Sequence, residues 1–471
     1  MMTVQEAVLA LNARAQGDGE FGCVVTDSRR MRAGALFVAL RGEHFDGHRF
    51  VAQASELGAG AAMVDRTWFD GGEDHGGVPL LIVDDTRLAL GRLAAHWRAR
   101  FALPVIGITG SNGKTTVKEM CAAILRARCV REGFGEADVL ATRGNLNNDI
   151  GLPLTLLELR DHHRAAVIEM GMNHPGEIGY LTDIARPTVA VVNNAQRAHL
   201  AGMGTLQQIA EEKGAIYAGL GATGVAVVNA DDVHAPLWRA LNAGRQVIGF
   251  GGSGAADVRG RVALQGLGSV IVLTVGDESA TLRLQVPGAH NAGNALAAAA
   301  CCLAVGVSLD DVVTGLGAFG GVKGRLQRRA GHAGALILDD SYNANPDSMR
   351  AGIDVLASTP GRTFLVMGDM GEVGDGSAQL HDEIGGYAKS KGIDGLFALG
   401  DMSAIAVRNF GEGAQHFKTP EALAAGLAKL LDADTVVLVK GSRFMRMERV
   451  ADLLAAVHND DPSNIGGSNA A

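Results

Sequence analysis

The segment from Gly107 to Thr116 contains glycines, a lysine and two threonines at the spacing of a phosphate-binding loop. Glycines let several backbone N–H groups turn toward one anion, and the lysine can reach the β- and γ-phosphates of a nucleotide. The hydroxyl of the first threonine can bind Mg²⁺. The alternative is a glycine-rich turn that only caps a helix. The predicted nucleotide-binding residues of the loop are Gly107, Ile108, Thr109, Gly110, Ser111, Asn112, Gly113, Lys114, Thr115 and Thr116.

An apolar strand and a helix must position this loop. Residues 105–109 are typical of a buried strand, and residues 117–126 carry Met120, Ile124 and Leu125 at helical spacing. The positive end of the helix dipole would then point at the bound phosphate. The usual pattern G-x-x-x-x-G-K-[ST] would place a glycine at position 108, but this chain has Ile there. We therefore interpret the loop as a short G-x-x-G-K-T-T variant.

Strands and helices alternate after the loop, which predicts a parallel sheet with helices on both faces. Ligands of such sheets bind beyond the carboxyl ends of the strands. Glu169 ends the strand 165–169, and His199 follows a strand that ends at Asn193-Asn194. The alternative for either side chain is a polar group satisfied within the fold. The predicted catalytic residues are Lys114, Glu169 and His199, and the predicted Mg²⁺ ligands are Thr115, Glu169 and His199.

Other polar side chains of the central segment have two interpretations each. The loop 142–149 holds Asn145, Asn147 and Asn148 within four positions, so it is either a turn or a clamp on a ligand. Asn291 begins an alanine-rich helix, where it can bond the edge of a nucleotide base or act as an N-cap. Lys213 lies on a predicted helix, 206–220, and most helix lysines are solvated.

The N-terminal residues 1–102 are predicted to form a small α/β domain with short strands at 36–40, 61–64 and 80–83. Two loops of this domain are dense in polar groups and can hold a polar ligand, although each is also compatible with a surface turn. The candidate substrate-binding residues of these loops are Asp27, Ser28, Arg29, Arg41, Asp46, Gly47 and His48.

The C-terminal residues 324–458 are predicted to form a Rossmann-like α/β domain. Its first strand, 336–340, ends in two carboxylates, and its last strand, 435–439, runs into a basic and flexible segment. The predicted substrate-binding residues here are Asn343, Asn345, Lys440 and Arg443, and the predicted nucleotide-binding residues are Arg325 and Asp340. The predicted fold class is therefore α/β in three domains, with a central P-loop parallel-sheet ATPase domain at 103–323 and a disordered polar tail at 459–471.

Composition limits the class of protein. The chain has 471 residues and a net charge of −9, so nothing favours nucleic acid as a partner. The longest apolar run, 295–305, is too short to cross a bilayer, and the N-terminus lacks the pattern of a signal peptide. The five cysteines lack C-x-x-C spacing, which favours reduced thiols. We therefore expect a cytoplasmic protein without membrane insertion.

Four of these stretches together resemble the Mur ligase family, over about residues 22–455. They are the phosphate-binding loop, residues 143–151 (RGNLNNDIG), Asn193-Asn194 with His199, and residues 340–346 (DSYNANP). The loop alone is shared with folylpolyglutamate synthases. The other stretches are similar to the branch of the family that adds D-alanyl-D-alanine, because ligases that add the third amino acid typically have His in place of one Asn of the last stretch.

The resemblance implies an ATP- and Mg²⁺-dependent ligase that joins D-alanyl-D-alanine to UDP-N-acetylmuramoyl-tripeptide through an acyl phosphate. It implies that the N-terminal domain holds the UDP end, that the central domain holds ATP, and that the C-terminal domain closes over the site of a monomer. It also implies that Lys213, in the segment 212–217, carries a carbamate and is then a catalytic residue and a ligand of a second Mg²⁺.

Several alternatives stay open from the sequence. Another Mur-type ligase or a folylpolyglutamate synthase would share the loop. A P-loop switch protein would not need the asparagine-rich loops, and a non-catalytic UDP-sugar-binding protein would not need Lys114 and Thr115. The third residue of the peptide, diaminopimelate or lysine, is not predicted.

Overall fold

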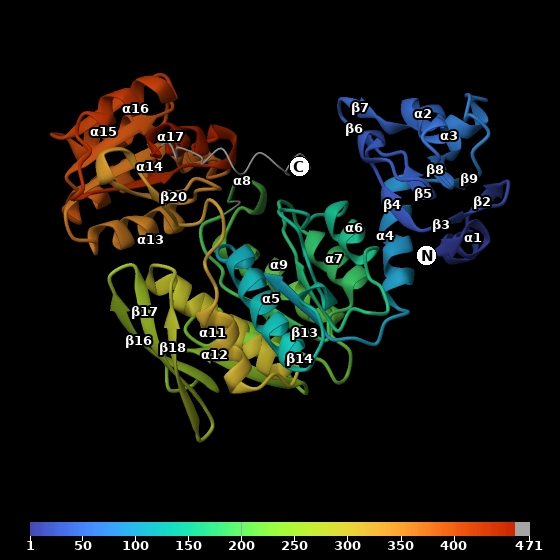
Figure 1. Cartoon of the computed structure of the whole chain (residues 1–471), viewed down its shortest axis with the longest axis horizontal. Coiled ribbons are helices and arrows are strands. Elements are labelled where there is room, and N and C mark those ends of the chain that lie inside the picture. The colour runs from blue at the N-terminus through green and yellow to red at the C-terminus, as the bar shows by residue number, and fades with distance from the viewer. Residues whose placement is uncertain (199, 457–471) are drawn as a thin grey trace, which may run out of the picture.

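The computed structural model describes residues 1–198 and 200–456. The candidate His199 and the predicted tail 459–471 lie outside the described residues. Figure 1 shows three α/β domains, with the N-terminal domain in blue and the C-terminal domain in orange and red on either side of the central domain. The α/β class and the three-domain organisation predicted from the sequence are confirmed. Within the described part of the chain, no helix is long and apolar enough to cross a membrane.

The N-terminal domain is built on a five-stranded sheet in the order β2-β9-β8-β5-β4. All neighbours are parallel except β2 and β9. Its strands are β2 (Arg14–Gln16), β4 (Cys23–Val25), β5 (Ala35–Val38), β8 (Ala61–Asp65) and β9 (Leu80–Val83), with the short strands β1 (Met2–Thr3), β3 (Glu20–Phe21), β6 (Arg41–Gly42) and β7 (Phe45–Asp46) outside it. Its helices are α1 (Val4–Leu11), α2 (Val51–Glu56), α3 (Arg66–Asp70) and α4 (Thr86–Arg98).

The central domain is built on a nine-stranded sheet in the order β11-β12-β10-β13-β14-β15-β16-β17-β18. It is parallel from β11 to β16, as predicted, but β17 and β18 are antiparallel additions that the parallel-sheet prediction did not include. Its strands are β10 (Val105–Thr109), β11 (Val139–Ala141), β12 (Ala165–Glu169), β13 (Val189–Val192), β14 (Val225–Asn229), β15 (Gln246–Gly251), β16 (Val258–Gln265), β17 (Gly268–Val275) and β18 (Glu278–Leu284).

Helices cover both faces of the parallel part of the central sheet, as expected of a strand-helix alternation. The helices are α5 (Lys114–Arg131), α6 (Gly151–Leu156), α7 (Glu177–Ala185), α8 (Leu200–Met203), α9 (Leu206–Gly214), α10 (Ala235–Leu241), α11 (Ala289–Ala304) and α12 (Leu309–Gly317). One face packs against α5, α11 and α12 through Ile106 and Ile108. The other packs against α4, α6, α7 and α9 through Ile168 and Val192, in a core that also contains Leu81 of the N-terminal sheet.

The C-terminal domain has a six-stranded sheet in the order β19-β20-β24-β21-β22-β23, parallel except for the edge strand β19. Its strands are β19 (Gln327–Ala330), β20 (Leu336–Asp340), β21 (Arg362–Gly368), β22 (Gly395–Leu399), β23 (Ala414–Phe417) and β24 (Thr435–Lys440). Its helices are α13 (Pro346–Ala357), α14 (Ser377–Ser390), α15 (Ser403–Phe410), α16 (Pro420–Ala428) and α17 (Glu448–Leu454). Because the last strand, β24, lies between β20 and β21, the ends of β20 and β24 meet at the switch point of the sheet.

Candidate active site

The phosphate-binding loop joins β10 to α5, and a neighbouring loop holds it in shape. Gly113 precedes α5 with φ of 81°, and a Cβ there would lie 2.6 Å from the amide nitrogen of Asn193. Only glycine fits this close approach and this backbone conformation. The side chain of Asn194 accepts a hydrogen bond from Asn112 N (2.9 Å), and Ser111 N donates to Asn194 O (3.0 Å). The loop is therefore preorganised by the end of β13.

Lys114 lies inside this loop. Its ammonium donates to Gly110 O at 2.7 Å, so it stands among the backbone groups that would surround a phosphate. Burial lowers the pKa of Lys114 below its usual value, the nearby carboxylate of Glu169 counteracts that shift, and the cation Arg325 adds to it. A lysine in this position can neutralise the charge of an anionic ligand.

One carboxylate oxygen of Glu169 accepts a hydrogen bond, and the other has no hydrogen-bond partner among the described residues. Its side chain is buried, and Oε1 accepts a hydrogen bond from the amide of Asn147 at 2.7 Å. Oε2 is buried without a hydrogen-bond partner among the described residues. A buried carboxylate oxygen left without a partner is costly unless a ligand completes it. This donor fits a hard cation such as Mg²⁺, and the Thr115 hydroxyl, which accepts from Arg325 at 3.1 Å, is a second oxygen donor.

Glu169 and Thr115 alone do not complete the coordination shell of a metal ion. In the described residues, no group of three or more His, Cys, Asp and Glu side chains is arranged to hold a metal. Mg²⁺ commonly takes one or two protein oxygens and completes its shell with water and phosphate. The residues present therefore fit a nucleotide-bound Mg²⁺, while the predicted ligand His199 cannot be placed.

Lys213 is not the solvated lysine that its helix position first indicates. Its side chain is 1% exposed, near the C-terminal end of α9. Burial lowers the pKa of Lys213 well below its usual value, and the charge of Lys114 adds to this shift. A lysine with a depressed pKa is neutral more often and hence more nucleophilic. Carbamoylation of Lys213 remains a prediction.

All three domains line one cavity of about 700 Å³ next to this loop. The N-terminal helix α4 contributes Arg87, the central domain contributes Lys114 and Glu169, and the C-terminal domain contributes Tyr342 and Arg443. The cavity brings together the following predicted residues: Ser111, Asn112, Gly113, Lys114, Asn145, Asn147, Asn148, Glu169, Arg325, Asn343, Asn345, Lys440 and Arg443. This volume is in the usual range for a ligand site.

A second cavity of about 350 Å³ adjoins the first and shares Asn112, Gly113 and Arg325 with it. It also includes Asn291, but this amide already donates to Pro287 O at 2.7 Å and accepts from Asn294 at 3.1 Å. Gly288, not Asn291, is the N-cap of α11. Asn291 is therefore not the N-cap, whereas its contact with a nucleotide base stays a prediction.

The C-terminal candidates are more rigid than predicted. Lys440 was expected in a flexible segment, but it is 3% exposed and bonds to Asp340 Oδ2 at 2.5 Å and to Asn343 O at 3.0 Å. The reason is that β24 lies inside the sheet, next to β20. The guanidinium groups of Arg325 and Arg443 lie 4.4 Å and 5.9 Å from the ring centre of Tyr342, so both cations interact with this one aromatic ring.

The N-terminal candidates lie outside the two cavities. Asp27 caps a short turn that begins at Ser28 and pairs with the exposed Arg29. Arg41 pairs with Asp65 at 2.8 Å. His48 is buried, with one ring nitrogen 2.7 Å from Asp46 and the other accepting from Asp65 N at 3.0 Å. His48 therefore helps to hold the loop in shape, and substrate binding by this loop stays a prediction.

Gly47 and Asn148, two further candidates for substrate binding, also have structural roles in their own loops. A Cβ on Gly47 would lie 2.8 Å from the backbone of Leu40, which explains the glycine by packing. The side chain of Asn148 accepts from Gly151 N at 2.8 Å and so caps α6.

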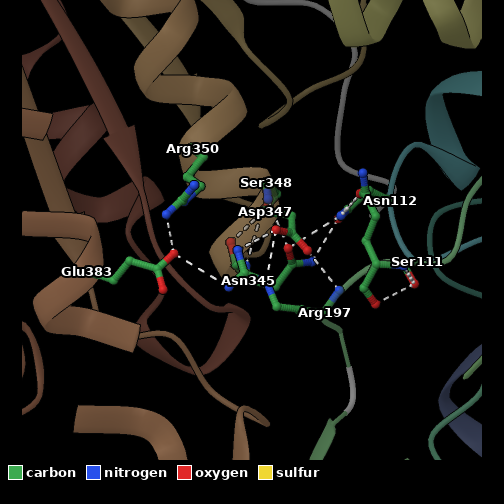
Figure 2. A network of polar contacts seen from close by, with 9 residues as sticks. Ser111, Asn112, Arg197, Asn345, Asp347, Ser348, Arg350 and Glu383 are labelled. Carbon is green, nitrogen blue, oxygen red and sulfur yellow. Dashed lines mark hydrogen bonds and ion pairs between the residues drawn. The ribbon is translucent and has the colours of Figure 1, made fainter. Parts of the chain in front are cut away.

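Two charged pairs at the site were not predicted. Arg87 of α4 forms a two-point ion pair with Asp149 of the asparagine-rich loop, with Nη2 to Oδ1 at 2.8 Å. Arg197 pairs with Asp347 across the central and C-terminal domains at 2.6 Å (Figure 2). No local pattern marks either pair, because the partners are 62 and 150 residues apart.

Comparison with known proteins gives a consistent family. The Mur ligase middle domain matches residues 108–302, the Mur ligase, glutamate ligase domain matches 324–443, and the Mur ligase family, catalytic domain matches 20–98. The chain is 42% identical to the UDP-N-acetylmuramoyl-tripeptide–D-alanyl-D-alanine ligase of Escherichia coli (strain K12), over 96% of this chain and 98% of that protein.

Solved structures agree with the sequence relatives. MurF from Acinetobacter baumannii has a TM-score of 0.87 and 38% identity, covering 96% of this chain and 98% of its own. MurF ligase from Thermotoga maritima in complex with ADP has a TM-score of 0.80 and 30% identity, covering 92% of this chain and 96% of its own. Folylpolyglutamate synthase from Mycobacterium tuberculosis shares the fold at 19% identity and a TM-score of 0.60. This chain belongs to the Mur ligase family.

Proposed function

We propose that this chain is an ATP-dependent ligase that joins D-alanyl-D-alanine to UDP-N-acetylmuramoyl-tripeptide and releases ADP and phosphate. The observation that carries the proposal is the single cavity lined by all three domains around Lys114 and Glu169. The 42% identity to a ligase of that name over nearly the whole chain selects the substrates. The reaction would serve the synthesis of peptidoglycan, in the cytoplasm, by a monomer.

The chemistry follows from the poor reactivity of a free carboxylate. The terminal carboxylate of the tripeptide attacks the γ-phosphorus of ATP, the bond to the β-phosphate oxygen breaks, and ADP leaves behind an acyl phosphate. The amine of D-alanyl-D-alanine then attacks the acyl carbon and loses a proton, and the tetrahedral intermediate expels inorganic phosphate. Lys114 and the loop amides would stabilise the charge on the transferred phosphoryl group, so positioning and electrostatics supply the catalysis.

Mg²⁺ would neutralise phosphate charge when bound. Thr115 and Glu169 would hold it, because they supply the oxygen donors described above. Lys213, if carbamoylated, would offer a further anionic oxygen donor, and His199 would be the remaining candidate. Asn147 orients Glu169 through its 2.7 Å bond, which leaves Oε2 toward the metal.

The C-terminal cations are the residues best suited to the second substrate. D-Alanyl-D-alanine ends in a carboxylate, and Arg443 lines the cavity with a side chain that is 60% exposed. Both cations already have an acidic partner, Asp340 for Lys440 and Glu448 for Arg443, but Arg443 is far more exposed to a ligand. Asn145 and Asn343 are the amide groups of the cavity wall that would contact the peptide.

The test is phosphate release from ATP in the presence of UDP-N-acetylmuramoyl-tripeptide. Release that requires D-alanyl-D-alanine supports the proposal, and release that requires glutamate with a folate acceptor would replace it by folylpolyglutamate synthesis. Parallel reactions with the diaminopimelate and lysine tripeptides identify the third residue. Light scattering on the purified chain would measure the oligomeric state.

A further inference from the structure

A compact polar network joins the central domain to the C-terminal domain beside the phosphate-binding loop (Figure 2). Nε and Nη2 of Arg197 donate to Oδ1 of Asp347 at 3.0 and 2.6 Å, and the backbone N–H of Arg197 donates to Oδ2 at 2.8 Å. The two side chains are 31% and 23% exposed. A multiply bonded, half-buried pair is held in one geometry far better than a surface ion pair.

The segment that carries Arg197 also holds the phosphate-binding loop. Gln196, its direct neighbour, bonds through its backbone to the Ser111 hydroxyl in both directions, at 2.9 and 3.0 Å. The side chain of Gln196 accepts from the amide of Asn112 at 2.6 Å. Arg197 is therefore anchored to the central domain one residue away from the bonds that hold Ser111 and Asn112.

A second bond crosses the same boundary two residues before Asp347. The amide of Asn345 donates to Asn112 Oδ1 at 2.8 Å. Asn345 is the N-cap of α13, and Asp347 lies in the first turn of that helix. Both cross-domain contacts thus come from one rigid helix start, and the Arg197–Asp347 pair fixes where Asn345 meets Asn112.

We propose that Arg197 is a positioning residue, whose pair with Asp347 seats the C-terminal domain on the phosphate-binding loop in the geometry needed for amide formation. The inference rests on the proposed function in one respect, namely that the C-terminal domain presents the dipeptide. When the pair is broken, the domain spends less time seated, so the attack by the dipeptide slows while the loop within the central domain stays intact.

The test is a double-mutant cycle with Arg197→Met and Asp347→Asn, and Lys391→Met is the matched control. Lys391 pairs at 2.7 Å with Asp354 of the same helix α13, and this pair lies within the C-terminal domain. Arg350 would not serve, because its partner Glu383 also contacts Nη1 of Arg197 at 3.5 Å. We expect each single variant to lower kcat/KM for D-alanyl-D-alanine about tenfold, equivalent to 1.4 kcal/mol, and the double variant to lose no more than either. The control should stay within about twofold of the parent.

Two outcomes would overturn the inference: losses that add in the double variant, or a loss in Lys391→Met equal to that in Arg197→Met. Asp347→Asn changes no volume, so it carries the test if Arg197→Met does not fold. Small-angle scattering with a non-hydrolysable ATP analogue and the UDP-tripeptide gives a readout independent of chemistry. Arg197→Met should compact less than the parent and the control, whereas failure of the proposed function would appear as a parent that turns over without the dipeptide.

Discussion

Replacing Glu169 by Gln tests the proposed metal site at the residue that carries it. The substitution keeps the shape of the side chain and the oxygen that accepts from Asn147. It removes the charge, and it replaces the partnerless Oε2 by an amide that cannot ligate Mg²⁺. The variant therefore distinguishes two roles of Glu169: a ligand of the metal, or a polar side chain with only a structural role at the end of β12.

The structure sets the expected size of two opposing effects. A buried carboxylate oxygen without a partner costs about 1–3 kcal/mol, which the substitution relieves in part. The attraction between Glu169 and Lys114, which holds the Lys114 pKa up, is lost at the same time. We expect these effects to cancel to within about 1 kcal/mol, so the melting temperature without Mg²⁺ should change by about 4 °C or less.

Turnover and metal binding should change far more. Loss of one preorganised electrostatic group costs about 10²–10³ in kcat. The parent should gain about 2.7 kcal/mol of stability when nucleotide-bound Mg²⁺ is at a hundred times its dissociation constant, and the variant should lose this gain. The assays are phosphate release over a Mg²⁺ titration and thermal unfolding with an ATP analogue, with and without Mg²⁺.

Glu177→Gln is the matched control, since this carboxylate lines the same cavity but already accepts from Asn173 N at 2.6 Å. The reasoning about Glu169 is refuted if Glu169→Gln keeps turnover within tenfold of the parent and an unchanged Mg²⁺ dependence. It is also refuted if both variants lose activity equally.

The remaining predictions concern the two lysines and the α4 contact. Lys114→Ala should lose at least about 10² in turnover with an unchanged circular dichroism spectrum; near-normal phosphate release would contradict it. Because the pKa of Lys213 is lowered in the folded chain, the unfolded chain binds one more proton between that lowered pKa and pH ~10.4, so an unmodified lysine there makes stability rise with pH across this window. Lys213→Met should then be more stable than the parent at pH 7 and equal to it above pH ~10.4, whereas a carbamate predicts no gain at pH 7. If the carbamate ligates metal, Lys213→Ala should lose activity and regain it with added acetate. A variant with unchanged activity would exclude a catalytic role for Lys213. Arg87→Met should raise KM for the UDP-tripeptide with kcat nearly unchanged, because α4 only frames the cavity; an unchanged KM would contradict that role.

Three buried strands whose ends carry site residues were predictable to the residue. β10, β12 and β20 have the predicted bounds, because short apolar runs flanked by glycine or charge are typical of buried strands in an α/β fold, whereas β13 and β24 differ from the prediction by a residue or two. Strand order was not predictable in the same way. Insertion of β24 beside β20 is a tertiary event, and it converts Lys440 from an expected flexible cation into a buried partner of Asp340.

Local residue types also fail where one pattern serves two purposes. The polar loop around His48 has the composition of a ligand site, and in the structure its groups also bond to one another and to a strand end, so composition alone cannot separate the two roles. Lys213 has the surroundings of a surface helix in sequence, yet it is buried. Arg197 and Asp347 look like ordinary surface charges, and only the packing of two domains makes them partners.

The distribution of apolar contacts indicates which domain can move. Leu81 of the N-terminal sheet and Ile168 of the central sheet belong to one continuous core, in which α4 is shared. The C-terminal sheet has two cores of its own, whose buried members all come from residues 326–454, and Leu267 is the partly buried central-domain side chain that packs against them. An apolar core resists separation, whereas half-buried polar contacts such as Arg197–Asp347 exchange readily with water. The C-terminal domain is therefore the part that can leave and return during a cycle, and the polar contacts beside the phosphate-binding loop decide where it stops.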